Sequence, residues 1–170
     1  AGVKYTSEFF SELQSGAPIT KGTVTLVSGT GDGQTYAPSI ANLKAMGYLD
    51  SSFSTQSMFS NGSTPPGNYK MKVLRVPAGC ELVSVNSCDI EGYAYPDQPI
   101  TAAGSTEPDG PAISAMIAPL GGSGGFSLVT TPNTVYGNGL GWTWNNPLAG
   151  NPAGVVVAKY DIVSPQQIKL

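Results

Sequence analysis

Residues 68–95 hold the feature that most limits the possible folds, because β-strand patterns there surround both cysteines of the chain. The stretch reads NYKMKVLRVPAGCELVSVNSCDIEGYAY. Tyr69, Met71 and Val73 alternate with polar residues, which is the period-two pattern of a strand with one buried face. Two further runs of high β-propensity follow, Leu82, Val83 and Val85, and then Ile90, Tyr93 and Tyr95. The stretch therefore predicts the centre of an antiparallel sheet.

The two cysteines, Cys80 and Cys88, form a candidate disulfide. An even cysteine count is typical of disulfide-bonded secreted proteins. Eight steps along a straight strand would separate the two Cα atoms by roughly 26 Å, whereas a disulfide needs less than about 7 Å. A bridge therefore requires the chain to reverse near residues 84–86. We favour the bridge, and two buried thiols on one strand are the alternative.

The size and composition of the chain predict one domain rich in β-structure, with long Gly-, Ser- and Pro-rich loops. At 170 residues the chain can bury a hydrophobic core, so one domain over residues 1–170 is predicted. The 22 Gly and 14 Pro residues suit a loop-rich protein in which β-structure dominates. Charged residues make up only 11% of the chain, well below the usual quarter.

The charged and titratable residues exclude several classes of function. Eight basic residues against 11 acidic ones give a net charge of −3, which argues against a nucleic-acid groove. The sequence has no histidine, so Ser-His-Asp and Cys-His catalysis and histidine zinc sites are excluded. No spacing selects a pair of catalytic carboxylates. We therefore predict no enzymatic activity and no cofactor. No apolar run reaches the roughly 18 residues that span a bilayer.

Two short helices are predicted from apolar periodicity. Tyr5, Phe9 and Leu13 share one face over residues 5–14. The second helix covers residues 40–46, between a serine N-cap and a glycine at the C′ position.

The remaining elements are predicted from shorter patterns. Strands are expected at residues 23–27, 126–130 and 154–163, and the last is apolar enough to be central in a sheet. Residues 112–118 (AISAMIA) fit a helix or a strand, because they show no strict alternation. Residues 164–170 are expected to form a tail.

Trp142 and Trp144, with Tyr136 and Tyr160, form an aromatic candidate site. Exposed rings beside asparagines could stack on a sugar, with apolar contact below and hydrogen bonds around it. Residues two apart on a strand face the same way, so the alternative places both indoles in the core. We favour the core placement and keep Trp142, Trp144 and Tyr136 as possible ligand contacts.

Acidic loops offer a calcium site as a further candidate. Their carboxylates are Asp32, Asp97, Glu107 and Asp109. Calcium requires six to eight converging oxygens, whereas each loop supplies only one or two carboxylates, at spacings unlike an EF-hand. We therefore predict solvated turns and no metal site.

The order of several motifs resembles the pilin-like N-terminal region of shufflon-type minor pilins (PilV-like) of type IVb pili. The resemblance covers about two-thirds of the chain. Its motifs are MGYLDSSF (46–53), NYKMKVLRVPAGCELVSV (68–85), AISAMIAPLGGSGGF (112–126), GNGLGWTW (137–144) and AGVVVAKY (153–160). Each motif is weak alone, and their order and spacing carry the resemblance.

The resemblance implies a structural subunit, a minor or major pilin, that acts by assembly into or at the tip of a surface fibre for adhesion or attachment. It also implies an α+β, pilin-like fold in which the N-terminal helix packs on a mainly antiparallel sheet. Residues 1–16 would be the remnant of that long helix, whose apolar anchor is missing from the sequence. The implied partners are other pilin subunits and a host or recipient-cell glycan, and membrane contact occurs only through the missing anchor. The implied location is the bacterial surface, after passage through the inner membrane.

Two features set this chain apart from that family pattern. The cysteine pair is internal and does not match the C-terminal loop disulfide of pilins, and no variable tip region follows. A secreted carbohydrate-binding or adhesin domain without fibre assembly is the alternative function.

Overall fold

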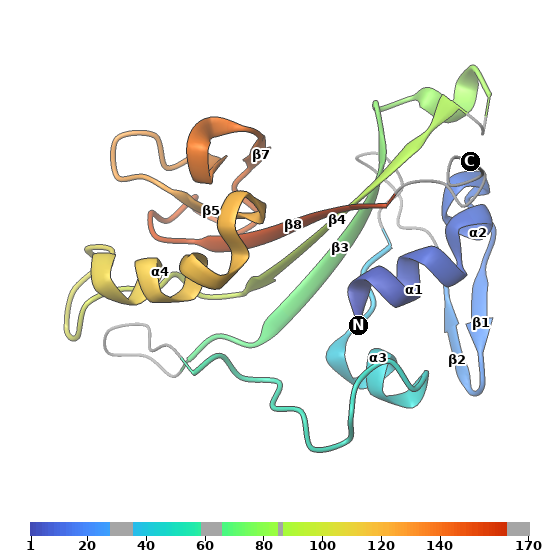
Figure 1. Cartoon of the computed structure of the whole chain (residues 1–170), viewed down its shortest axis with the longest axis horizontal. Coiled ribbons are helices and arrows are strands. Elements are labelled where there is room, and N and C mark those ends of the chain that lie inside the picture. Colours follow the sequence, from blue (N-terminus) through green and yellow to red (C-terminus); the bar gives the residue numbers. More distant parts are fainter. Residues whose placement is uncertain (28–35, 59–65, 85–86, 163–170) are drawn as a thin grey trace. The chain divides into compact units, whose positions relative to one another are not determined.

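The computed structural model describes residues 1–27, 36–58, 66–84 and 87–162 (Figure 1). Its helices are α1 (Gly2–Glu8), α2 (Phe10–Ser15), α3 (Ile40–Ala45) and α4 (Gly110–Ile117). Its strands are β1 (Ile19–Lys21), β2 (Val24–Leu26), β3 (Tyr69–Val76), β4 (Asp89–Pro96), β5 (Gly124–Ser127), β6 (Thr134–Gly137), β7 (Thr143–Asn145) and β8 (Val156–Ile162). Short 3-10 helices cover Cys80–Leu82, Ala118–Ser123 and Asn138–Leu140. The predicted tail at residues 164–170 lies outside the described residues.

The strands form two sheets. β1 and β2 make an antiparallel hairpin, and the other strands form a six-stranded sheet in the order β3-β4-β8-β5-β6-β7. β5 pairs antiparallel with both β6 and β8, and β6 pairs antiparallel with β7. Helices combined with an antiparallel sheet confirm the α+β class at the coarse level.

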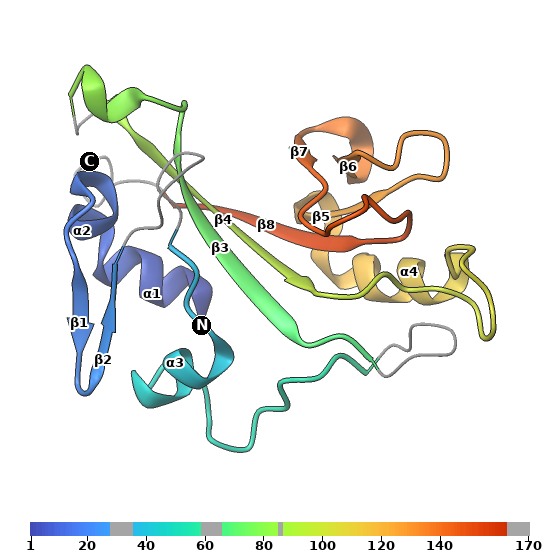
Figure 2. The ribbon, with the colours of Figure 1, turned by 180° about the vertical axis from the view of Figure 1, so that it is seen from behind.

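The chain divides into two compact units. The first unit comprises Ala1–Phe53, Lys70–Tyr93 and Tyr160–Leu170, and the second comprises Ser54–Tyr69 and Ala94–Lys159. The first therefore contains α1, α2, α3 and the β1–β2 hairpin, and the second contains α4, β5, β6 and β7 (Figures 1 and 2). The single domain expected from the sequence stays a prediction.

The first unit is built around the N-terminal helical segment. The predicted helix at residues 5–14 is present, but it breaks at Phe9, whose φ of −106° and ψ of 24° separate α1 from α2. Tyr5 and Leu13 are fully buried and share one core with Met71 and Val73 of β3. The apolar face expected from the sequence therefore does pack on strand residues.

The second predicted helix is confirmed as α3. Ser39 accepts a hydrogen bond from the Asn42 backbone N–H, while the Asn42 side chain accepts one from the Ser39 backbone, which completes a capping box. Gly47 follows with a φ of 82°, a conformation that glycine adopts without steric cost. The strand expected at residues 23–27 is β2, and its partner β1 was not predicted.

The second unit has an aliphatic core under α4. Ile113 and Ile117 of α4 pack with Ile100 and Val156, and Phe126 of β5 lies against this cluster. The ambiguous residues 112–118 are helical because Asp109 caps the helix and a proline occupies its first turn. The strand expected at residues 126–130 is present as β5, which lies earlier in the chain and ends at Ser127.

One sequence-based prediction is wrong. Leu82 and Val83 belong to a 3-10 helix and its C-cap and do not form a strand, and Val85 lies outside the described residues. The reason is the disulfide between Cys80 and Cys88, which holds their Cα atoms 5.2 Å apart. An extended strand between them would need roughly 26 Å. Among the described residues, no helix is long and apolar enough to cross a membrane.

Candidate functional site

The aromatic candidates of the second unit lie on the β6–β7 hairpin. Tyr136 lies on β6 opposite Thr143 of β7, and Trp144 of β7 pairs with Val135. Trp142 directly precedes β7, and its carbonyl accepts the Gly137 N–H at 2.8 Å. All three aromatic side chains are half-buried. The core placement that the sequence favoured is therefore met only in part, since neither indole is fully buried.

Trp142 rests on a pair of glycines. Gly125 of β5 and Gly137 of β6 are directly opposite in register. A Cβ atom at Gly125 would lie 2.8 Å from the indole, and one at Gly137 would lie 2.4 Å from it. Because neither glycine has a side chain, the indole can lie directly against the backbone of the two strands. The indole N–H donates to the Gly122 carbonyl at 2.8 Å, and the Lys159 ammonium lies 5.9 Å from the ring centroid.

Trp144 has a different neighbour. Its ring centroid lies 5.8 Å from that of Tyr95, with the planes tilted by 59°. Such tilted aromatic pairs contribute about 0.5–1.5 kcal/mol beyond the area they bury. Burial raises the pKa of Tyr95 to about 12, so its hydroxyl stays protonated at neutral pH. The two tryptophans are thus held by separate contacts.

The described acidic residues make separate contacts with backbone and serine groups and do not converge on one point. Asp97 accepts the Asn68 N–H at 2.8 Å, and Asp109 caps α4. Glu107 closes a turn through its backbone, which bonds to Ser105 and Ala102. Within the part of the chain that the structure describes, no group of acidic and cysteine side chains could hold a metal ion. Asp32 lies outside that part.

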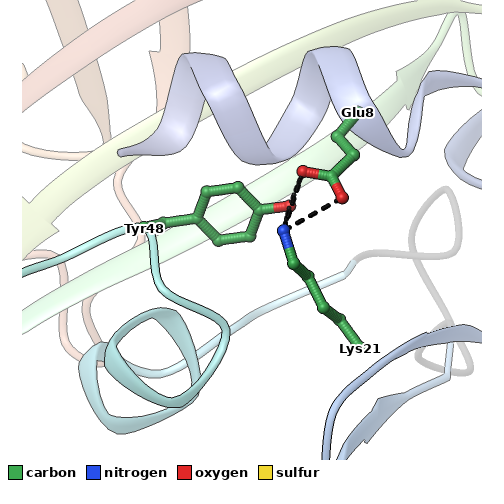
Figure 3. Close-up of polar contacts among 3 residues, drawn as sticks. All are labelled: Glu8, Lys21 and Tyr48. Carbon is green, nitrogen blue, oxygen red and sulfur yellow. Dashed lines mark hydrogen bonds and ion pairs between the residues drawn. The ribbon is translucent and has the colours of Figure 1, made fainter.

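A polar cluster of Glu8, Lys21 and Tyr48 joins three segments of the first unit (Figure 3). Lys21 Nζ lies 3.0 Å from both carboxylate oxygens of Glu8 and 3.2 Å from the Tyr48 hydroxyl. The Tyr48 hydroxyl also donates to Glu8, and the Lys21 ammonium lies 4.3 Å from the centre of the Tyr48 ring. The cluster ties α1 to β1 and to the turn after α3.

The contacts of this cluster favour the charged forms of both ionised groups. The hydrogen bond from Tyr48 lowers the pKa of Glu8, with a smaller effect from Lys21. The hydrogen bond to Glu8 raises the pKa of Lys21. Burial, and then the bond to Glu8, raises the pKa of Tyr48. A carboxylate that stays ionised and an ammonium that stays protonated are poor proton-transfer groups at neutral pH, so the cluster stabilises structure.

The disulfide expected from the sequence is confirmed between Cys80 and Cys88, and it closes a loop with apolar residues at its surface. Leu82 is 88% exposed and Val83 is 84% exposed. Exposed apolar side chains next to one another are candidates for contact with a partner. Their β-propensity in the sequence therefore does not reflect a buried strand.

Arg75, which was not a predicted site residue, and Tyr160, the fourth aromatic candidate, lie in the first unit and have unusual environments. Arg75 is almost completely buried, and its place in the alternation after Met71 and Val73 is the signal that could have revealed this. Tyr160 lies over Gly92, where a Cβ would be 2.0 Å from the ring. No local pattern in the sequence predicts that contact.

No family model, no curated protein and no solved structure matches the chain.

Proposed function

We propose that the chain is a structural subunit of a type IVb pilus-like surface fibre and that it acts by assembly. The observation that carries this proposal is the packing of the N-terminal helical segment. Tyr5 and Leu13, on the apolar face of that segment, are fully buried and share one core with Met71 and Val73 of β3, the first strand of the six-stranded sheet. A subunit built in this way presents the opposite face of its helix to other subunits.

Exposed apolar side chains of the first unit support this proposal. Val3 on α1 is more than half exposed, as are Leu82 and Val83 in the disulfide loop. Apolar side chains in these positions gain free energy when a neighbouring subunit covers them. The disulfide fits an oxidising location outside the cytoplasm, which the proposal places at the bacterial surface after an inner-membrane intermediate.

The first test is to read the coding sequence upstream of Ala1 and to image the cells. We expect a short basic leader, a Gly or Ala junction and about 20 apolar residues. An antibody raised against this chain should then label fibres along their length or at their tips, and deletion of the gene should remove the label. A conventional cleaved signal peptide directly before Ala1, with the protein recovered as a secreted monomer, would contradict the proposal.

A carbohydrate-binding domain is the second candidate, and the half-exposed indole of Trp142 favours it. One part of that ring is seated on the backbone at Gly125 and Gly137, which fixes its orientation, as a stacking platform requires. Titration with a panel of oligosaccharides should quench tryptophan fluorescence if this site binds sugar. Trp142→Leu should abolish binding, whereas Tyr48→Leu, in the other unit, should retain it. Unchanged fluorescence across the panel would exclude this candidate for the sugars tested.

A further inference from the structure

Arg75 is a buried cation on the core-facing side of β3. Buried and half-buried residues alternate along the second half of this strand, and Arg75 follows Met71 and Val73 on the buried side. Only 3% of its surface is exposed, less than for Met71. Burying an unpaired cation costs several kcal/mol. An arginine cannot avoid that cost by losing its proton, because its pKa is too high.

The guanidinium of Arg75 uses only part of its hydrogen-bonding capacity. Nη1 donates to the Gln14 carbonyl at 3.3 Å. Nε and Nη2 each have less than 1 Å² of accessible surface and no hydrogen-bond partner among the described residues. A buried donor without a partner costs about 1–3 kcal/mol. The two donors without an acceptor, Nε and Nη2, therefore lie on one edge of the guanidinium.

Two polar side chains close to Arg75, Gln14 and Tyr36, bond to other groups. The Gln14 side chain donates to the Cys88 carbonyl at 3.0 Å. The Tyr36 hydroxyl donates to the Glu12 and Ala17 carbonyls. These carbonyls lie at the C-terminal end of α2, which favours a cation by about 0.3–1 kcal/mol. That gain is smaller than the cost of burial. Lys21 and Glu8 form an ion pair that does not include Arg75.

We propose that Arg75 binds a carboxylate through Nε and Nη2. These two nitrogens are the adjacent, parallel donors on one side of the guanidinium, and a carboxylate accepts such a pair with both of its oxygens. The carboxylate is that of a small organic acid or that of a neighbouring protein chain. Because both nitrogens are covered, a carboxylate can reach them only after the residues that cover them have moved. The inference rests on Arg75 and is independent of fibre assembly.

The test measures thermal unfolding in sodium acetate and in sodium chloride, at the same concentration and neutral pH. Acetate should raise the unfolding midpoint of the wild type above its value in chloride, by about 2–4 °C for each kcal/mol of binding free energy. Arg75→Met should lose this response. Lys72→Met removes a cation from the other side of the same strand and should retain it.

Sedimentation of the wild type and Arg75→Met in chloride separates the two sources of the carboxylate. Acetate stabilisation of a monomer that depends on Arg75 identifies a small acid. Self-association of the wild type that Arg75→Met abolishes identifies a neighbouring copy of the chain. If neither effect depends on Arg75, the proposal is wrong. A large fall in the midpoint of Arg75→Met, without an acetate response in the wild type, would likewise overturn it, since the guanidinium would already be paired.

Discussion

Both units place an aromatic ring over strand glycines, but they hold the ring in different ways. In the first unit Tyr160 covers Gly92 and Gly2, and its hydroxyl lies 3.3 Å from both Thr6 and Met71. In the second unit Trp142 covers Gly125 and Gly137, and its N–H bonds to one loop carbonyl. Tyr160 therefore contacts an N-terminal helix and two strands, whereas Trp142 contacts the paired strands β5 and β6 and the loop before β5.

The comparison shows that a glycine beneath an aromatic ring can support core packing in one unit and a partly exposed ring in the other. Tyr160 is half-buried and packs against the core of the first unit, so the glycine beneath it is part of the packing that holds α1. The seat of Trp142 leaves part of the indole open to solvent. The sequence places both tryptophans in the second unit, so tryptophan fluorescence reports on that unit alone.

Gly92→Ala should have the largest effect on stability. The new Cβ would lie 2.0 Å from the Tyr160 ring, and overpacking of this kind costs about 1–3 kcal/mol or more. Chemical denaturation should show a loss of about 3 kcal/mol, at the upper end of that range, with native tryptophan emission unchanged. Gly92→Ala combined with Tyr160→Ala should show less than the sum of the two single losses. Additive losses would mean that the clash lies elsewhere.

Gly137→Ala should cost less, about 1–2 kcal/mol, because Trp142 can swing away once its hydrogen bond to the Gly122 carbonyl breaks. Its native emission should shift to longer wavelength as the indole becomes solvated. Gly141→Ala is the matched control, because its φ is −72° and a Cβ atom there would come within 4 Å of no described residue beyond its chain neighbours. Equal losses for Gly92→Ala and Gly137→Ala would remove the distinction between the two units.

Removal of the disulfide should destabilise the first unit. Cys80→Ser with Cys88→Ser should lower the free energy of unfolding by about 2.5 kcal/mol, the value for a closed loop of this length. Native tryptophan emission should stay unchanged. A reducing agent should destabilise the wild type and have no effect on the double variant. If the emission also changes, the disulfide supports both units.

Two tyrosines of the first unit should respond differently to loss of their hydroxyl groups. Tyr36→Phe removes hydrogen bonds to the Glu12 and Ala17 carbonyls and should cost about 1 kcal/mol. The buried Tyr5 hydroxyl has no hydrogen-bond partner within the described part of the chain, so Tyr5→Phe should leave stability unchanged or raise it. Denaturation of both variants in parallel provides the comparison. A loss for Tyr5→Phe equal to that for Tyr36→Phe would show that Tyr5 also has a partner.

The smallest effect should come from acid titration of Glu8. Its contacts lower its pKa in the folded state, so its contribution is complete above the ordinary pKa of glutamate and is lost as the pH falls through the lowered value. Glu8→Gln should therefore flatten this part of the stability curve. Asp89→Asn, at an exposed position, is the control. An unchanged acid profile for Glu8→Gln would rule out this contribution.

Local patterns were sufficient to predict several elements. Alternation predicted β3, and the cap residues predicted α3 because both act within a few neighbouring residues. The reversal between Cys80 and Cys88 followed from the length of an extended chain. The same argument could have shown that Leu82 and Val83 do not extend the sheet.

Other features depend on contacts between distant residues and were not predictable. The break at Phe9 interrupts a helix whose apolar spacing looks continuous. The half-buried state of Trp142 depends on glycines of two other strands. In neither case does the sequence nearby show what the tertiary packing selects.

The first unit is discontinuous, and this affects the order in which the protein can form. Its last described contributions come from β8, where Tyr160 completes the contact with Gly2 and Gly92. During synthesis, all residues of the second unit are made before Tyr160 becomes available, although domains usually fold from the N-terminus. Contacts of such high sequence separation slow folding. A nascent chain therefore keeps its N-terminal helices without their final cover until Tyr160 has been made.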